Sequence, residues 1–152
     1  MDELRVPRRR IPARIVLDDG RTIEGDLFTA PVGHDGGPER LLDHLNDPSE
    51  EFVPVAAGSD RFVLNKSGII LLHIAGGPDE AGIPETFEGH EAPVRISLTG
   101  GLGVIGRLPI AMPPERSRVL DYLNASPRFV PLLGEGQVTL LQRGYIVTVR
   151  SE

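Results

Sequence analysis

The chain carries one pattern of residues twice. Pro12-Ala-Arg-Ile-Val-Leu17 and Pro93-Val-Arg-Ile-Ser-Leu98 share proline, arginine, isoleucine and leucine at the same four places. Further matches follow in the same order: Arg40-Leu-Leu-Asp-His-Leu-Asn46 with Arg118-Val-Leu-Asp-Tyr-Leu-Asn124, Phe52-Val-Pro54 with Phe129-Val-Pro131, and Leu64, Gly68 and Ile70 with Leu140, Gly144 and Ile146. Because the order is kept while the spacing drifts only slightly, we interpret the chain as a tandem duplication, and the fold must accommodate two copies of one small unit.

Both copies have the residue pattern of short strands. Ala13, Ile15 and Leu17 recur at every second position, which places them on one face of a strand. Asp19-Gly20 and Gly100-Gly101 are signals for tight hairpin turns. The 18 Gly and 14 Pro residues favour many short strands over long helices. The strands expected after the first one lie near 23–27, 52–56, 61–65 and 69–74 in the first copy, and near 104–108, 129–133, 137–142 and 145–150 in the second.

Between the second and third strands of each copy we expect a short helix. Its apolar face consists of Leu41, Leu42 and Leu45 in the first copy and of Val119, Leu120 and Leu123 in the second. Asn46 and Asn124 are predicted to end these helices in the left-handed conformation, shortly before Pro48 and Pro127.

Gly25 and Gly106 occupy matching inward positions of the second strand in each copy. A glycine in a strand usually marks a sharp bend or a close approach of another backbone. Five short antiparallel strands cannot bury a core while they stay flat, and curling into a small barrel solves this problem. We therefore expect an all-β fold with a short helix per repeat, arranged as two tandem five-stranded bent barrels.

Composition along the chain predicts four segments. Residues 1–10 form a basic N-terminal arm with the run Arg8-Arg9-Arg10, which is either a solvated tail or an arm that touches phosphate. Residues 11–76 form the first repeat and residues 92–152 the second. Residues 77–91 contain five acidic residues and no basic residue, which predicts an acidic linker.

The charge differs between the two repeats. Residues 11–76 carry 5 basic and 11 acidic residues, a net charge of −6, whereas residues 92–152 carry 7 basic and 4 acidic residues, a net charge of +3. Binding to nucleic acid draws much of its affinity from Lys and Arg side chains that neutralise phosphates. The acidic first repeat therefore argues against a broad nucleic-acid surface, though not against a local one.

Several classes of protein are excluded by composition. Cysteine is absent, which excludes disulfides and thiolate metal sites. No stretch approaches the ~20 apolar residues of a membrane span, and the N-terminus lacks the apolar core of a secretory signal. We therefore expect a cytoplasmic protein that makes no contact with a membrane.

No motif in the chain indicates catalysis. Gly101-Leu-Gly-Val-Ile-Gly106 has the spacing of a dinucleotide-binding loop, but a strand-like segment follows it instead of a helix, so we interpret it as a hairpin turn and a bend. The four histidines do not recur between the copies, and no serine lies in a Gly-x-Ser-x-Gly motif. We expect no enzymatic activity, no cofactor and no metal ion.

The most informative polar residues form two acid–asparagine pairs, Asp43 with Asn46 and Asp121 with Asn124. In one interpretation, the carboxylate binds nearby loop amides while the asparagine ends the helix. In the other, each pair lines a polar pocket that occurs once per repeat. The sequence leaves both interpretations open.

Two features resemble the Sm-like proteins. Ile23-Glu-Gly-Asp-Leu27, followed by Asp43 and Asn46, is similar to the glycine-containing strand and the Asp…Asn pair of that family. Leu140-Leu-Gln-Arg-Gly-Tyr-Ile-Val147 resembles its closing hairpin, which contains Arg-Gly, and residues 64–70 are a looser copy. The resemblance extends to bacterial Sm-like families of unknown function and implies a five-stranded bent barrel in each repeat.

The same resemblance implies a ring, because strand four of one Sm-like barrel pairs with strand five of the next. We therefore expect a non-catalytic, oligomerising interaction or adaptor module, with three chains forming a ring of six units. The alternative is RNA binding at a face of the ring. The candidate contacts for RNA or another ligand are Asp43, Asn46, Lys66, Asp121, Asn124 and Arg143.

Overall fold

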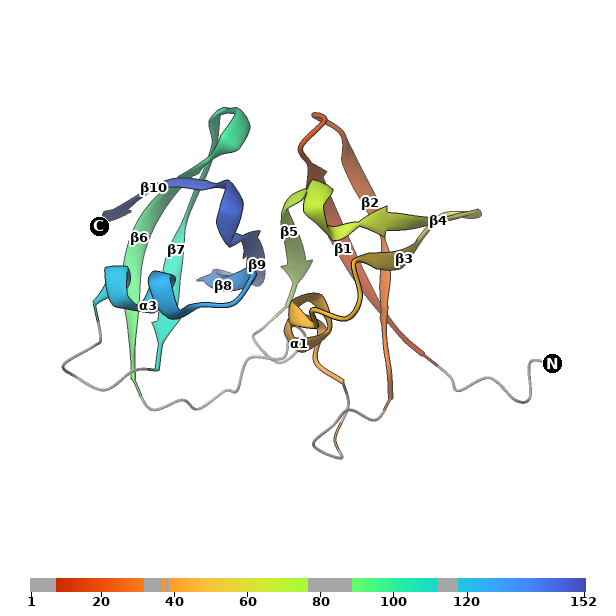
Figure 1. Ribbon diagram of the computed structural model, residues 1–152, viewed down its shortest axis with the longest axis horizontal. Helices are drawn as coiled ribbons and strands as arrows, with labels where there is room; N and C mark the ends of the chain where they lie inside the picture. The colour runs from red at the N-terminus through yellow and green to blue at the C-terminus, as the bar shows by residue number, and fades with distance from the viewer. Residues whose placement is uncertain (1–7, 32–36, 38, 77–88, 112–117) are drawn as a thin grey trace.

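The computed structural model of the protein describes residues 8–31, 37, 39–76, 89–111 and 118–152. These residues form ten β-strands and two short α-helices, which confirms the predicted all-β class (Figure 1). The first half consists of β1 (Arg9–Leu17), β2 (Thr22–Thr29), α1 (Leu41–Asn46), β3 (Phe52–Ala57), β4 (Asp60–Asn65), the 3-10 turn η2 (Lys66–Gly68) and β5 (Ile69–Ala75). The second half consists of β6 (His90–Leu98), η3 (Thr99–Gly101), β7 (Leu102–Ile110), α3 (Val119–Ala125), β8 (Phe129–Gly134), β9 (Gln137–Gln142), η5 (Arg143–Tyr145) and β10 (Ile146–Ser151).

The alternation of the sequence determines which face of β1 is buried. Ile11, Ala13, Ile15 and Leu17 are buried, while the residues between them are exposed or half-buried. β6 shows the same alternation over its last five residues. Successive side chains of a strand point to opposite faces, so these strands present one apolar face to the interior.

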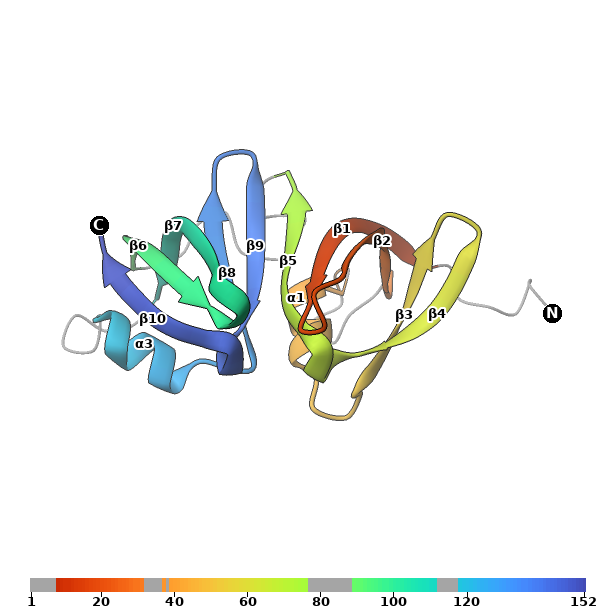
Figure 2. The ribbon, with the colours of Figure 1, turned by 90° about the horizontal axis from the view of Figure 1, so that it is seen from above.

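All ten strands belong to one antiparallel sheet with the order β10-β6-β7-β8-β9-β5-β1-β2-β3-β4. Each half has the same internal order, because its last strand pairs with its first. The halves meet where β5 pairs with β9, a contact that we call the seam. Each half bends strongly (Figure 2), but the sheet stays open, with β10 and β4 at its two ends. The observed pairing is therefore one open sheet, whereas the sequence predicted two barrels.

The register of the strand pairs relates the two halves position by position. Phe52 pairs with Asn65 in the first half, and Phe129 pairs with Gln142 in the second, so each residue lies 77 positions before its equivalent. Leu17 pairs with Ile69 in the first half and Leu98 with Ile146 in the second, so β5 and β10 keep the offset of 77, whereas β1 and β6 are related by an offset of 81. We call residues related in this way counterparts.

This register corrects the last part of the sequence alignment. The counterpart of Leu64 is Leu141 and not the predicted Leu140, and the counterpart of Gly68 is Tyr145 and not Gly144. When two apolar strands are aligned, a shift of one residue matches apolar residues almost as well as the correct alignment does. Residue identity therefore could not fix the register, although a shift by one residue reverses the faces of a strand.

Two hydrophobic clusters, the first core and the second core, lie within the bends of the two halves. The seam strands contribute to both. From β5, Leu72 enters the first core and Leu71 the second, while from β9 Leu140 enters the first core and Leu141 the second. Side chains on opposite faces of the same two strands thus fill different cores. The two halves consequently pack against each other through both clusters.

Gly25 and Gly106 lie where a neighbouring strand crosses closely. A Cβ atom at Gly25 would lie 2.9 Å from the carbonyl oxygen of Ala56 on β3, and one at Gly106 would lie 2.6 Å from that of Leu133 on β8. The next residues, Asp26 and Arg107, make the paired contacts of β2 with β3 and of β7 with β8. The predicted close approach at these two glycines is confirmed.

The predicted left-handed ends of the helices are wrong. The residues that end α1 and α3 are Asp47 and Ser126, both with extended backbone, and no residue other than glycine has a positive φ in the part of the chain that the structure describes. Pro48 and Pro127 follow directly. The proline ring disfavours helical conformation in the residue before it, so the prolines favour ending these helices at Asp47 and Ser126.

The strands begin slightly outside the predicted repeat boundaries. β1 includes Arg9 and Arg10 from the predicted arm, and β6 includes His90 and Glu91 from the predicted linker. Residues 1–7 and 77–88, which make up most of the arm and most of the linker, lie outside the described residues.

We expect Gly106→Val to lower the free energy of unfolding by about 1–3 kcal/mol, because the new side chain would collide with the backbone of β8. Gly103→Val in the same strand is the matched control, since the nearest atom to its Cβ would lie 3.9 Å away and its φ is not positive. Denaturant titration of the two variants tests this. Equal loss of stability in both would contradict the close approach.

Candidate assembly interface

The seam is a regular antiparallel ladder. It runs from Leu71 opposite Leu141 to Ala75 opposite Gln137. Near its middle, the Nδ1 atom of His73 lies 2.8 Å from the hydroxyl of Thr139. Burial, together with the nearby positive charge of Arg14, lowers the pKa of His73. The imidazole is therefore neutral at pH 7, and the ladder contains no buried charge at this position.

Arg128 forms the main polar contact across the seam. Its guanidinium donates to both carboxylate oxygens of Glu51 at 2.9 and 3.0 Å, and to the hydroxyl of Ser67 at 2.9 Å. Its Nε donates to the side-chain oxygen of Gln142 at 2.7 Å. These hydrogen bonds to Arg128, with a further one from Ser67, lower the pKa of Glu51 to about 2. A bidentate arginine–carboxylate pair of this kind fixes the orientation of its two partners.

Gln142 and Tyr145 extend this polar network. The amide nitrogen of Gln142 donates to the carbonyl oxygens of Lys66 and Ile69, at 3.0 and 2.6 Å, on the opposite side of the seam. The hydroxyl of Tyr145 lies 2.6 Å from an oxygen of the Asp18 carboxylate, and this hydrogen bond raises the pKa of the phenol. Backbone groups at the start of β5 are thereby satisfied by side chains of the second half.

Asn46 contacts the backbone of the second half. Its Oδ1 accepts from the N–H of Phe129 at 2.7 Å, and its Nδ2 donates to the carbonyl oxygen of the same residue at 3.2 Å. The side-chain amide thus pairs with Phe129 as a neighbouring strand does. Of the sequence-predicted site residues, Asn46 is the one whose side chain takes part in the contact between the halves, while Lys66 takes part through its backbone carbonyl oxygen.

Lys66 and Arg143 end the two helices. Lys66 is fully buried, and its ammonium donates to the carbonyl oxygens of His44 and Asp47 at the end of α1. Burial lowers its pKa. Arg143 is exposed and donates to the equivalent carbonyl oxygens at the end of α3. A cation at the C-terminus of a helix satisfies carbonyl groups that have no partner within the helix.

The remaining predicted site residues do not meet in a pocket. Asp43 is exposed on α1. On α3, the carboxylate of Asp121 accepts a hydrogen bond at 3.0 Å from the guanidinium of Arg118, the residue that precedes the helix. Asn124 is exposed at the end of α3. Asp43 and Asp121 bind no loop amide among the described residues, so the predicted amide contacts are not made there.

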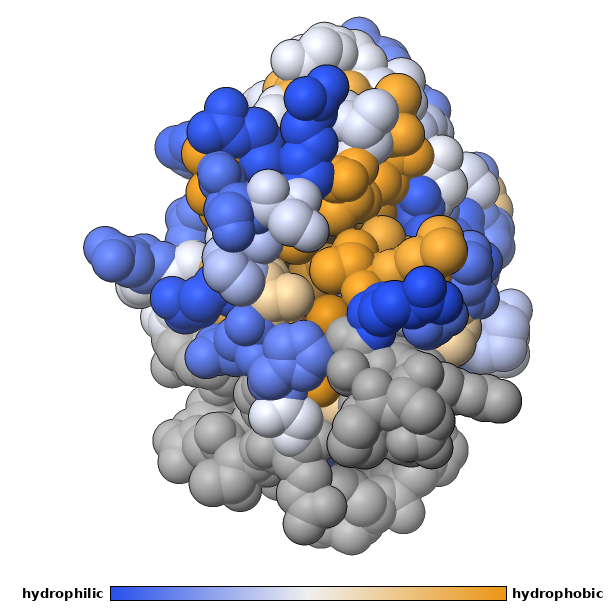
Figure 3. Space-filling view, turned by 90° about the vertical axis from the view of Figure 1, so that its left-hand side faces the viewer, coloured by the Kyte–Doolittle hydropathy of each residue, from blue (hydrophilic) through white to orange (hydrophobic). Residues whose placement is uncertain are grey.

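The two ends of the sheet carry exposed apolar side chains. Val63 on β4 is 67% exposed, and Val147 on β10 is 65% exposed. Phe52, at the start of β3 and next to β4, is 56% exposed. Figure 3 views the end of the molecule that carries β10, β6 and α3, where apolar side chains form a band between polar ones. Apolar residues on an unpaired strand favour contact with another strand.

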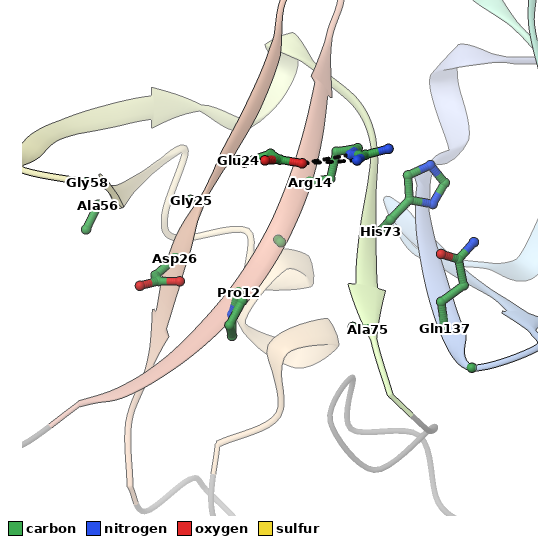
Figure 4. Close-up of a pocket in the computed structure, with 12 residues that line it drawn as sticks. Pro12, Arg14, Glu24, Gly25, Asp26, Ala56, Gly58, His73, Ala75 and Gln137 are labelled. Atoms are coloured by element: carbon green, nitrogen blue, oxygen red, sulfur yellow. Dashed lines mark hydrogen bonds and ion pairs between the residues drawn. The ribbon is translucent and has the colours of Figure 1, made fainter.

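An open groove of about 690 Å³ follows the outer side of the seam (Figure 4). His73 from β5 and Gln137 from β9 line one side of it, Ala56 and Gly58 line the other, and the ion pair of Arg14 with Glu24, 3.0 Å long, lies between them. Its floor consists of small residues, among them Gly25. The charged side chains of Arg14, Glu24 and Asp26 line the groove together with these small residues.

A second hollow, of about 720 Å³, lies beside Phe52. Phe52 and Pro54 line it, together with the carboxylates of Glu39 and Glu50. His44 lines it as well, and its Nε2 atom is buried without a hydrogen-bond partner among the described residues. The surface beside Phe52 is therefore acidic and partly apolar.

Comparisons add no relative. No family model matches the chain, and neither a curated protein nor a solved structure matches it. Within the described ranges, no three His, Asp or Glu side chains gather as metal ligands. No helix in those ranges is long and apolar enough to cross a bilayer.

The sequence did not single out the polar residues of the seam. Glu51 and Arg128 are counterparts that directly precede the repeated Phe-Val-Pro segment, and they carry opposite charges. This reversal of charge at a repeated position was the sequence signal that could have identified the contact between Glu51 and Arg128. It becomes meaningful only when the two copies are known to touch at that position.

We expect Lys66→Ala to lower the free energy of unfolding by about 2–4 kcal/mol, because it leaves a cavity and two buried carbonyl groups without a donor. Arg143→Ala should have a distinctly smaller effect, since water replaces the exposed guanidinium. Thermal or chemical denaturation of the two variants checks this. Equal effects would contradict the different burial of the two cations.

Proposed function

We propose that the protein is a non-catalytic interaction module that assembles head-to-tail with other copies of itself into a closed ring. The observation that carries this proposal is the pair of free sheet ends, β10 on the second half and β4 on the first. An edge strand presents unpaired backbone N–H and C=O groups that accept another strand. Contact between two different ends is head-to-tail, so it closes into a ring or continues as a filament.

The seam supports this pairing, because β10 is the counterpart of β5, and β4 is the counterpart of β9. Applied to the free ends, the register of the seam puts Val149 of one copy opposite Val63 of the next. The counterpart of Val63 is Leu140, and the counterpart of Val147 is Ile70. Both counterparts are buried at the seam, whereas Val63 and Val147 are exposed. Burial of these two valines between copies would remove apolar surface from water.

The charges of the halves also support a head-to-tail contact. Such a contact brings the second half of one copy, where residues 92–152 carry a net charge of +3, to the first half of the next, where residues 11–76 carry −6. Complementary charge favours this pairing over contact between like halves.

We propose further that each half is an Sm-like unit and that the chain is a tandem duplication of it. The identical strand order of the halves, the glycines at equivalent close approaches and the constant register of counterparts support this. Three chains would then supply six units, so the preferred assembly is a trimer with cyclic symmetry.

The structure adds no observation in favour of the alternative, RNA binding at a face of the ring. The ammonium of Lys66 is buried and holds two carbonyl groups, so it does not reach a phosphate. Arg143 is exposed, but its guanidinium is engaged at the end of α3. A preparation that contains RNA would show a high ratio of absorbance at 260 nm to that at 280 nm, because the chain has no Trp and only 2 Tyr.

We expect light scattering to give three times the chain mass of 16.5 kDa at micromolar concentration. Val63→Lys and Val147→Lys should each shift the mass toward that of the single chain, because each puts a charge into a contact between copies. Ile105→Lys is the matched control, because Ile105 is 63% exposed on β7, away from both ends of the sheet. The mass of the assembly should not change in this variant. A wild-type protein with the mass of one chain contradicts the proposal.

Mixing the two edge variants distinguishes a head-to-tail contact from a two-fold one. Val63→Lys keeps a functional β10, and Val147→Lys keeps a functional β4. An equal mixture should therefore form a complex of two chains through the single intact contact, although each variant alone stays monomeric. Native mass spectrometry of differently tagged variants measures this. In a two-fold contact between identical edges, one variant alone would keep the dimer.

A further inference from the structure

The two cores differ in how completely they are covered. The first contains 17 buried residues and 3 partly buried ones, whereas the second contains 10 of each. Partly buried members of the second core include Val119 and Leu123 on α3, and Ile146 and Val149 on β10. These elements lie at the end of the molecule that shows the apolar band (Figure 3). Within the described residues, the second core is therefore less completely covered at the side of α3 and β10.

The first core is closed because the second half reaches into it. Phe129 and Leu133 from β8, and Val138 and Leu140 from β9, are members of the first core. Phe129 is fully buried there. Among the residues that the structure describes, no strand covers the second core in the same way, since β10 is the last strand of the sheet.

The counterparts of these residues lie at the opposite end of the molecule. Phe52 is the counterpart of Phe129, and Val63 is the counterpart of Leu140. Both are largely exposed, whereas Phe129 and Leu140 are fully buried. At one end of the molecule, the second core lacks such a cover in the part of the chain that the structure describes. At the other end lie Phe52 and Val63, the counterparts of residues that fill the first core.

We propose that Phe52 and Val63 of a second copy of this chain complete the second core, and that the side-chain amide of Asn124 pairs with the backbone N–H and C=O of that Phe52. This inference rests on the head-to-tail assembly proposed above and assigns its apolar anchor and its polar anchor. The second core of one copy is thus filled by the β4 end of another copy.

The role of Asn124 follows from that of Asn46, which makes this contact with Phe129 inside the chain. The residues just before the two asparagines, Leu45 and Leu123, both face their own cores. Both asparagines are the sixth residue of their helix, although α3 continues for one further residue, Ala125, before it ends. Asn124 is exposed, and in the described part of the chain it makes no contact of this kind.

The surroundings of Phe52 fit the second half of another copy. In the seam, α1 lies against β8, so the same arrangement brings α3 of one copy against β3 of the next. The hollow beside Phe52 is lined by carboxylates, among them Glu39 and Glu50. The half that would cover it carries a net positive charge. Shape and charge thus select a second copy as the occupant.

Introduced cysteines test the register of this contact, because the chain has no cysteine of its own. The double variant Val63→Cys, Val149→Cys should form disulfide-linked oligomers on oxidation, since the seam register puts these positions opposite each other in neighbouring strands. Val63→Cys combined with Ile105→Cys is the control and should stay at the level of random crosslinking. Equal crosslinking of the two pairs overturns the register.

Two single substitutions test the anchors. Phe52→Ala and Asn124→Ala should each raise the dissociation constant of the oligomer at least about tenfold, as loss of an interface anchor does. The matched control is Asn46→Ala. It should lower the denaturation midpoint of the chain but change the dissociation constant less than about twofold, because Asn46 acts within one molecule. Sedimentation velocity over a dilution series gives the constants.

The outcomes separate this inference from the proposed function. A wild-type protein that stays monomeric overturns both. An oligomer whose dissociation constant is unchanged by Phe52→Ala and Asn124→Ala overturns the inference alone, because the copies then assemble through another surface. Normal denaturation midpoints for the Phe52→Ala and Asn124→Ala chains show that weaker assembly does not result from unfolding.

Discussion

The pairing of β5 with β9 determines the arrangement of the whole molecule. This ladder joins two bent halves into one sheet, and its side chains enter both cores. It also decides which strands remain unpaired, because a strand has only two edges. β5 uses its edges for β1 and β9, so β4 and β10 are left at the two ends. The free ends are therefore a consequence of the seam and not a separate feature of the fold.

The sequence predicted what depends on local periodicity and turn chemistry. Strand alternation, the short helices and the bend glycines Gly25 and Gly106 all follow from patterns within a few residues. Contacts between the copies are not encoded in that way. The pairing of Asn46 with Phe129 depends on where the second half lies. The left-handed helix ends were wrongly predicted because the effect of Pro48 and Pro127 on the preceding residue outweighs the preference of asparagine.

The burial of equivalent positions carries information that neither copy contains alone. Residues that are alike in sequence and in local structure differ in exposure only because their neighbours differ. Phe129 is buried and Phe52 is exposed, although both begin the third strand of their half. In an isolated single unit, the exposure of such a phenylalanine would have no obvious meaning. Here the buried counterpart is the reason for the proposal that the second half of another copy covers Phe52.

The charge reversal between Glu51 and Arg128 bears on why two unlike units occur in one chain. In a ring of alternating halves, every contact brings a first half to a second half, so an acidic position always meets a basic one. Contact between two first halves would bring Glu51 to Glu51, and contact between two second halves would bring Arg128 to Arg128. Like charges held together cost free energy, so this position disfavours both wrong pairings. Covalent linkage of the two halves enforces the same alternation. The linkage and the charge pattern therefore select the same order of units.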